Sequence, residues 1–257
     1  MHTIPFSNLT LSAIPVVITI YILYKWSHDY KNGIYAVCRM LGQLLIIGYF
    51  LAFIFESDSA YIVLGVASFM LFVSAWISLR TLPDRRIKLY FKALISLLIG
   101  GGLALVLMSL GILQLDPWYS PRFFVPLAGM VFANSMNCIS LAADRLNGEL
   151  ERGGEMERGI EFEKARNIAF RAALIPSTNQ LFAVGLVAIP GMMTGQILSG
   201  VSPLIAARYQ IMIMCMIFGT SGITTACFLT FARPYFVRDE TKDDDKNNQG
   251  ITDENTD

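Results

Sequence analysis

The sequence lacks the short motifs that mark the common kinds of catalytic site. It contains no GxxxxGK[ST] phosphate-binding loop, no HExxH zinc motif and no GxSxG nucleophile motif. Its two histidines, His2 and His28, stand at opposite ends of a long apolar run, so they are not expected to share a metal ion. Hydrolytic and metal-centred catalysis are therefore not expected of this chain. Any energy that it uses must come from a gradient or from another subunit.

Charged residues are also scarce, at 16% of 257 residues, and their formal net charge is zero. This balance gives no reason to expect a nucleic-acid partner. Hydrophobic residues make up 54% and the mean hydropathy is +0.52, whereas soluble domains average about 45–50% apolar residues. The composition is typical of a membrane protein with several spans. The cysteines form no CxxC pair and are expected to be buried, inert thiols: Cys38, Cys138, Cys215 and Cys227.

Seven runs of mostly apolar residues approach the length of about 20 that crosses a bilayer as a helix. They predict an all-α, polytopic membrane helix bundle of about seven transmembrane helices over residues 1–238. The acidic stretch 239–257 is predicted to be a disordered cytoplasmic tail. No basic segment precedes the first run, which therefore reads as a span and not as a cleavable signal peptide. The predicted spans are 4–24, 36–55, 60–79, 91–113, 122–142, 178–199 and 205–232.

Lysine and arginine gather in alternate connections between these spans. Because basic residues are retained on the cytoplasmic side of a membrane, the connections that hold them are expected to be cytoplasmic. The C-terminus would then be cytoplasmic and the N-terminus outside, in a bacterial inner or plasma membrane. The basic connections are 25–39, 80–92 and 145–171, and those with neither residue are 56–59, 114–120 and 200–203.

Residues 143–176 form the one sizeable polar segment before the tail. Apolar residues recur in it at spacings of three and four, which predicts a helix with one apolar face. The glycine pair at 153–154 is expected to divide the segment into a short helix and a longer one, and Pro176 to mark the entry to the next span. The segment is thus predicted to be a helical elbow in the cytoplasm. Its apolar face consists of Phe162, Ala165, Ala169 and Ala172.

The fifth predicted span carries two amides on one helical face. Met130, Asn134 and Asn137 follow one another at spacings of four and three residues. Polar groups are costly in the hydrocarbon region and tend to face the bundle interior. They either form hydrogen bonds between helices, worth about 0.6 kcal/mol each on average, or line a polar path. The sequence leaves both interpretations open.

The sixth predicted span contains the string IPGMMTGQILSG, residues 189–200. Its Pro-Gly pair is expected to loosen the helix in mid-span, which is tolerated where the freed backbone meets protein or a water-filled cavity. Met192, Met193 and Gln196 would then line the cavity. Thioethers bind hydrated hard cations poorly, so flexible lining is favoured over direct metal ligation. A second pattern, small residues at every fourth position, predicts a helix-packing face of Gly191, Gly195 and Ser199.

Three strings together closely resemble one membrane family, which comprises bacterial iron-export ABC permeases and plant aluminium-sensitivity proteins. They are PLAGMVFANSMNCISLAADRL at 126–146, AALIPSTNQL at 172–181, and VGLVAIPGMMTGQILSGVSPLIAARYQIMIM at 184–214. The strongest match covers residues 126–217. The Gly-Met-Met-Thr-Gly-Gln string, followed by Tyr209-Gln210, is specific to this resemblance.

The resemblance implies an ABC transporter in which two permease chains pair with two separate ATP-binding subunits. ATP and magnesium would lie on those partner subunits, and this chain would bind no cofactor of its own. No metal ligand set is predicted. The substrate path would comprise Met130, Asn134, Asn137, Met192, Met193 and Gln196. The residues expected to couple this chain to the ATP-binding subunit are Glu149, Arg152, Glu157, Arg158, Glu161, Phe162, Glu163, Arg166 and Arg171.

One stretch departs from the expected family pattern. Residues 161–164 read Glu-Phe-Glu-Lys, where relatives are expected to carry small residues such as Leu-Gly-Ala. This leaves the register in which the segment docks on the ATPase open, but not the class of protein.

Several functions compete on these observations. The leading hypothesis is export of iron or a related metal. The second keeps the same architecture but moves an organic solute, such as a sugar nucleotide or a metal chelate. The third is a membrane scaffold that an ATPase remodels without transport. The missing motifs argue against an intramembrane enzyme, and no span has a central Asp or Glu of the kind that a proton-coupled secondary transporter requires.

Overall fold

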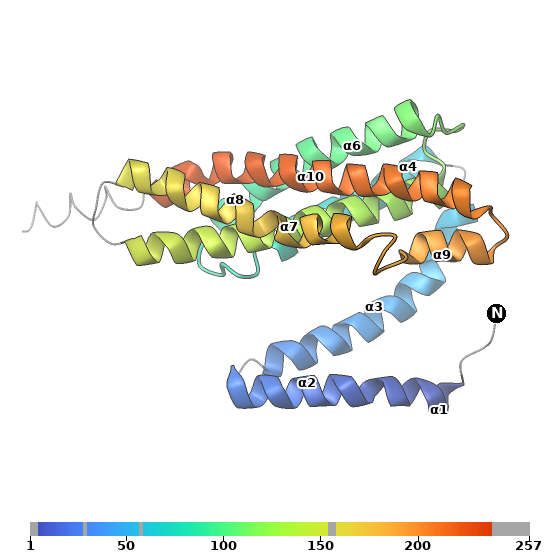
Figure 1. Ribbon diagram of the computed structural model, residues 1–257, viewed down its shortest axis with the longest axis horizontal. Helices are drawn as coiled ribbons and strands as arrows, with labels where there is room; N and C mark the ends of the chain where they lie inside the picture. Colours follow the sequence, from blue (N-terminus) through green and yellow to red (C-terminus); the bar gives the residue numbers. More distant parts are fainter. Residues whose placement is uncertain (1–4, 28–29, 57–58, 154–157, 238–257) are drawn as a thin grey trace, which may run out of the picture. The chain divides into compact units, whose positions relative to one another are not determined.

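The computed structural model describes residues 5–27, 30–56, 59–153 and 158–237, and in these ranges the chain is almost entirely helical (Figure 1). It divides into two compact units, Met1–Ser57 and Asp58–Asp257. The first unit holds α1 (Phe6–Leu9), η1 (Thr10–Ser12), α2 (Ala13–Trp26) and α3 (Tyr30–Glu56). The second holds α4 (Ala60–Ser78), α5 (Arg86–Leu97), η2 (Leu98–Gly102), α6 (Leu103–Val106), η3 (Leu107–Ile112), α7 (Pro121–Gly153), α8 (Arg158–Ala183), α9 (Gly191–Leu198) and α10 (Pro203–Val237).

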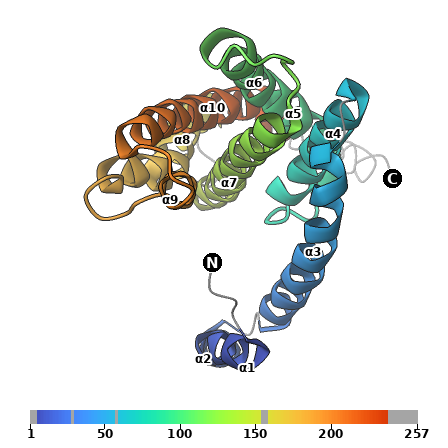
Figure 2. The same ribbon diagram turned by 90° about the vertical axis from the view of Figure 1, so that its right-hand side faces the viewer.

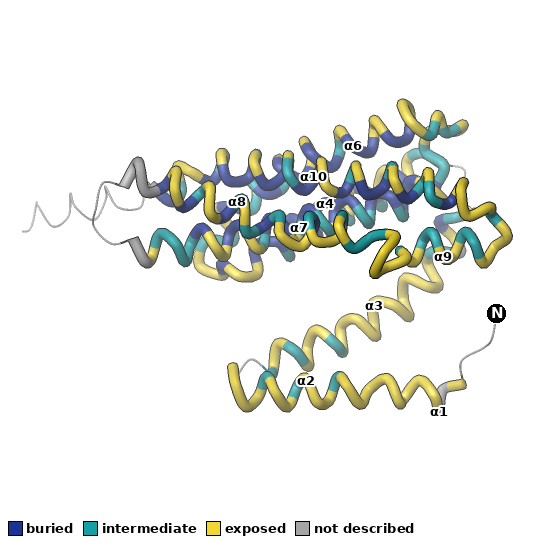
Figure 3. Tube along the Cα trace, in the orientation of Figure 1, coloured by how far each residue is buried: buried dark blue, intermediate teal, exposed yellow. Residues whose placement is uncertain are grey.

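The first unit is a helical hairpin in which α2 packs against α3. The rings of Tyr24 and Tyr30 meet edge to face across the connection, with their centroids 5.2 Å apart. Nearly all of the side chains on both helices are exposed although most are apolar (Figure 3). A single helical hairpin has no core of its own to bury them, so an exposed apolar surface of this extent fits a lipid environment.

In the second unit, α7 is the central helix. It packs against α4 on one side and against α8 and α10 on the other, and α10 also contacts α5 and η2 (Figure 2). The buried residues lie on the faces that these helices turn toward one another, among them Val63, Leu89, Ile139, Phe228 and Leu229. The core is therefore a stack of long helices on either side of α7.

The fold confirms the prediction of a polytopic all-α membrane protein. Within the described ranges, five helices are long and apolar enough to cross a membrane, and Thr10–Trp26 is a shorter apolar helix. The sixth predicted span differs from the prediction. Residues 178–199 do not form one helix, because α8 ends at Ala183 and α9 begins only at Gly191. The five long helices are Tyr30–Glu56, Ala60–Ser78, Arg86–Ile112, Pro121–Glu151 and Pro203–Phe236.

The fourth span contains two stretches of π-helix, η2 and η3, within otherwise α-helical structure. Two buried glycines in η2 permit a very close approach to neighbouring helices. A Cβ atom on Gly100 would overlap the Thr224 hydroxyl of α10, and one on Gly101 would lie 2.7 Å from a ring carbon of Phe132 in α7. Glycine is thus required here for contact, a role that the sequence pattern did not indicate.

The predicted elbow is formed by the end of a long helical hairpin. α7 ends at Gly153 and α8 begins at Arg158, so the predicted division at the glycine pair is confirmed. The helix before the pair is not a separate short one, because α7 runs without a break from Pro121. Pro176 lies inside α8 and does not begin a new element. Hydropathy marks the boundary between apolar and polar residues. A helix continues across that boundary when its backbone hydrogen bonds and its packing against other helices continue.

The predicted apolar face of this segment is confirmed for three of its four residues. Phe162, Ala165 and Ala169 are buried, with exposed fractions of 1%, 3% and 0%. Ala172 is only half-buried, and Ala173 is fully buried. The face shifts by one residue because 3.6 residues per turn places 162, 165, 169 and 173 closest to one line along the helix.

Candidate functional site

The most unusual feature of the second unit is the interruption between α8 and α9. After Ala183 the chain forms a tight turn in which the Gly185 amide donates a hydrogen bond to the Ala188 carbonyl at 3.0 Å. Gly185 has φ +83°, a conformation that L side chains rarely adopt, so glycine allows the chain to leave α8 here. Pro190 then precedes α9 in an extended conformation. The Pro-Gly pair therefore starts a new helix, where the sequence analysis expected only a loosened one.

A cavity of about 430 Å³ lies between this interruption and α10. Gln210 is 6% exposed and lines the cavity, where its amide adds a polar group to an otherwise largely apolar wall. The lining residues are Leu181, Val184, Gly185, Ile189, Pro190, Met193, Ala207, Gln210, Ile211, Met214 and Cys215.

Three of the predicted path residues lie on α7. Met130 and Asn134 are half-buried and Asn137 is exposed. The Asn134 amide Nδ2 donates to the Met130 carbonyl of its own helix at 2.8 Å. The Asn134 hydrogen bond is therefore intrahelical, and not the bond between helices that was one interpretation of this pair.

The other three predicted path residues lie on α9. Met192, Met193 and Gln196 are all half-buried. The Gln196 Oε1 atom is buried without a hydrogen-bond partner among the described atoms. Met193 lines the cavity beside Gln210. Two features of α9 suit transient contact with a cargo. They are the Gln196 oxygen, which accepts no hydrogen bond in the described chain, and the Met193 thioether at the cavity wall.

The two sets are not brought into one cluster. α9 packs mainly against α10, whereas α7 packs against α4, α8 and α10. The predicted packing face of α9 is also uncovered: nothing in the described chain lies within 4 Å of a Cβ position at Gly191 or Gly195. Sequence spacing alone could not show this, because it assigns residues to helix faces without saying which helix each face meets.

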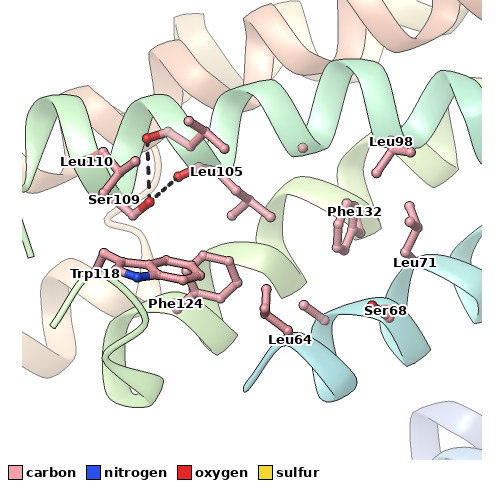
Figure 4. A pocket seen from close by; sticks show the side chains of 13 residues that line it. Leu64, Ser68, Leu71, Leu98, Leu105, Ser109, Leu110, Trp118, Phe124 and Phe132 are labelled. Atoms are coloured by element: carbon pink, nitrogen blue, oxygen red, sulfur yellow. Dashed lines mark hydrogen bonds between the residues drawn. The ribbon is translucent and has the colours of Figure 1, made fainter. Parts of the chain in front are cut away.

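A second cavity, of about 400 Å³, lies between α4, the fourth span and α7 (Figure 4). Its wall is formed by side chains such as Leu64, Leu98, Trp118 and Phe132. The buried Ser109 hydroxyl that borders it is satisfied by its own helix, because it donates to the Leu105 carbonyl at 2.8 Å. This cavity offers a ligand little beyond apolar contact, so the cavity beside α9 is the better candidate site.

No group of three or more His, Cys, Asp or Glu side chains that could hold a metal ion occurs within the described ranges. The expectation of four buried cysteines is wrong for Cys38 and Cys215, which are exposed, and Cys227 is only half-buried. Cys138 is buried, and its sulfur lies 3.6 Å from the Ser177 hydroxyl. Apolar sequence neighbours predicted burial, but an apolar neighbourhood in a membrane helix also occurs on the lipid side.

Comparison with known proteins decides the family. The family described as "Uncharacterised protein family (UPF0014)" matches residues 6–236. The chain belongs to this family. No solved structure matches it.

The relatives come from bacteria and plants, as the resemblance implied. The chain is 37% identical to "UPF0014 membrane protein slr1647" of Synechocystis over 83% of this chain and 87% of that protein. It is 31% identical to "Probable iron export permease protein FetB" of Escherichia coli over 92% of this chain and 95% of the relative. It is 27% identical to "Protein ALUMINUM SENSITIVE 3" of Arabidopsis thaliana over 86% and 84% of the two chains.

The predicted coupling residues that the structure describes in this UPF0014 chain lie at the end of α7 and along α8 from its start to its middle. Glu149 is half-buried and forms an ion pair with Arg145 at 2.7 Å. Phe162 is buried, and the Arg233 guanidinium lies 5.8 Å from its ring centroid. Glu163 and Arg171 are exposed, and Arg166 is half-buried with its Nη2 3.3 Å from the Asn167 amide oxygen. Glu157 lies outside the described residues, as do the side chains of Arg152, Arg158 and Glu161.

A set of buried hydroxyls in the UPF0014 fold was missed by the sequence analysis. The hydroxyls of Ser135, Ser221, Thr224 and Thr225 are fully buried and have no partner among the described groups. Ser221, Thr224 and Thr225 share α10, and Thr224 faces Gly100 of η2. The string TSGITTA at 220–226 holds these three residues and could have indicated them.

Proposed function

We propose that this UPF0014 chain is the transmembrane permease subunit of an ABC transporter that exports iron or a related metal. The observation that carries the proposal is the match over nearly its whole length to the bacterial protein named a probable iron export permease. The interrupted helix supports it, because discontinuous helices in transporters provide backbone and side-chain groups to a cargo at lipid depth. The chain would bind no ATP, and hydrolysis would occur on a partner subunit.

The proposed assembly contains two copies of this chain, two ATP-binding subunits and the surrounding bilayer. In it, the N-terminus is outside and the tip of the α7–α8 hairpin is cytoplasmic, as the distribution of Lys and Arg favours. Exposed charged residues on α8, Glu163 near the tip and Arg171 in the middle of the helix, would contact the ATPase. Phe162 is buried, so its part would be to hold the tip against α10.

The hairpin gives a direct mechanical connection between the ATPase and the candidate site. α8 has 26 residues, which corresponds to about 39 Å at 1.5 Å per residue. One end lies at the hairpin tip and the other at the interruption before α9. A displacement imposed on the tip would reach the turn at 184–190 through a continuous helix, and would move α9 relative to α10. Opening and closing the cavity in this way would alternate access to the two sides.

The first test is recovery of the partner. The tagged full-length chain is solubilised from its native membranes in a mild detergent and purified by its tag. We expect an ATP-binding subunit to be recovered in equal amount. Recovery of this chain alone in several detergents would contradict the transporter and favour a scaffold. Reconstituting the complex in liposomes with ferrous iron, and separately with a sugar nucleotide, then separates the two kinds of cargo by which one raises the ATPase rate.

The path residues provide a second test. Replacing Asn134, Asn137 or Gln196 by alanine is expected to lower flux about threefold for a lost contact of about 0.6 kcal/mol, and at most about twentyfold for one of about 1.7 kcal/mol. Flux is measured in liposomes, and assembly by size-exclusion chromatography. Asn179→Ala is the matched control, because Asn179 is an exposed amide on α8 outside the proposed path. Unchanged flux in all three variants would remove these residues from the path.

A further inference from the structure

The cavity beside α9 gathers sulfur atoms from two helices. Met193 reaches it from α9, and Met214 and Cys215 reach it from α10. On α10 the lining residues are spaced at i, i+3, i+4, i+7 and i+8 from Ala207, which is one continuous face of a helix. The three sulfur-bearing side chains are therefore placed on the two walls of one cavity and not scattered through the apolar sequence.

These side chains differ in what surrounds them. Met214 is 5% exposed, whereas Cys215 is an exposed free thiol. Gln210, one turn before Met214, is 6% exposed and contributes an amide to the same wall. The wall thus offers two thioethers, one thiol and one amide.

The charge of the wall decides which cations suit it. None of the eleven lining residues carries a formal charge. Hard cations such as Ca²⁺ and Mg²⁺ prefer carboxylates and water, and burying one in a neutral, largely apolar wall leaves its charge uncompensated. A soft monovalent cation prefers thiolate and thioether sulfur. A monovalent cation bound to one thiolate has zero net charge, so a largely apolar cavity can hold the pair.

We propose that this cavity is a binding site for a soft monovalent metal ion of the Cu(I) or Ag(I) class, held by Met193, Met214 and Cys215. On binding, the Cys215 sulfur keeps the electron pair of its S–H bond and donates it to the metal, and the proton leaves to the buffer. The oxidation state of the metal does not change. The Gln210 side chain lines the same cavity.

The size of the cavity fits an exchangeable site better than a rigid cage. A volume of about 430 Å³ is far larger than one ion. Methionine has three rotatable bonds and adapts its position, so Met193 and Met214 can close on an ion and release it again. The inference rests on the cavity lining and not on the proposed transport, because binding needs neither the ATPase nor flux.

The test measures Cu(I) binding to the purified full-length chain in detergent without oxygen. Bicinchoninate competes for the metal, and its coloured Cu(I) complex reports how much the protein withholds. All variants carry Cys38→Ser, which removes the exposed thiol of the first unit. We expect one Cu(I) per chain, with one proton released. Cys215→Ser and Met214→Leu should each weaken binding by about tenfold to a hundredfold, as is found when metal-site groups are lost.

Matched controls lie on the same helix. Met212 and Cys227 are half-buried residues of α10 outside the cavity wall, so Met212→Leu and Cys227→Ser should bind Cu(I) as the parent does. The proposal is overturned if the parent withholds no Cu(I) from the chelator, or if Cys215→Ser and Met214→Leu bind as tightly as the controls. Displacement of Cu(I) by an equal concentration of Fe(II) would also contradict the proposal. Sulfur ligands should favour Cu(I) over Fe(II), and such displacement would show that the site does not.

Discussion

Phe162→Ala is expected to destabilise the protein by about 3–5 kcal/mol, the range observed when a buried phenylalanine is truncated to alanine. Phe162 is 1% exposed at the start of α8, and it is the largest fully buried side chain near the hairpin tip. Its ring also meets the Arg233 guanidinium of α10, 5.8 Å from the centroid. The variant loses both contacts and leaves a cavity between α8 and the rest of the bundle. Thermal unfolding in detergent measures the effect.

Phe182→Ala provides the control for this prediction. Phe182 lies on the same helix but is 77% exposed, so its truncation removes little packing within the protein. A fall in the unfolding midpoint only for Phe162→Ala would show that the hairpin tip is packed on α10 in solution. Equal midpoints for the two variants would contradict that packing. If the tip also couples to an ATPase, Phe162→Ala should lower cargo-stimulated hydrolysis more than basal hydrolysis.

The second large effect is expected at Gly100. Gly100→Ala places a Cβ atom where it overlaps the Thr224 hydroxyl and lies 3.1 Å from the Thr224 backbone nitrogen. Overpacking of this kind typically costs about 1–3 kcal/mol, because neighbouring backbone must move. The gain in helix propensity from glycine to alanine, about 1 kcal/mol, opposes only part of this cost. The unfolding midpoint should therefore fall.

Two variants make this test specific. Gly102→Ala lies in the same π-helical stretch, where a Cβ atom would meet Leu98 at an ordinary contact distance of 3.6 Å, so its midpoint should stay level or rise. Thr224→Ala removes the hydroxyl that has no partner in the described chain and should partly restore Gly100→Ala in the double variant. Two results together would contradict this packing of η2 against α10: Thr224→Ala does not raise the midpoint of Gly100→Ala, and Gly102→Ala lowers the midpoint as much as Gly100→Ala does.

The class of protein could be predicted from the sequence because it depends on local patterns. Long apolar runs require helices in lipid, where each backbone group must be satisfied within its own segment. The break near Pro190 was also predictable, since proline removes a donor and restricts the residue before it. The apolar face of Phe162, Ala165 and Ala169 follows from helical spacing alone.

The candidate site was only half predictable. The sequence singled out Met193 because a thioether and an amide are unusual beside a helix break. It gave no reason to select Gln210, Met214 or Cys215, which stand in an ordinary apolar helix and become a cavity wall only where α9 lies against α10. Asn134 and Asn137 are the converse case, because they share a helix face as predicted but do not join the α9 residues in one cluster.

By itself, the sequence determined that the chain is a helical membrane protein, where most of its spans lie and that a Pro-Gly pair weakens one of them, because hydropathy and backbone chemistry act over a few residues. The tertiary structure decided the rest. It showed that α7 and α8 continue as one hairpin past the polar boundary, that Gly100 is the contact point for Thr224, and that sulfur atoms from two helices face one cavity. These features depend on which helices become neighbours, and packing between residues far apart in the chain determines that.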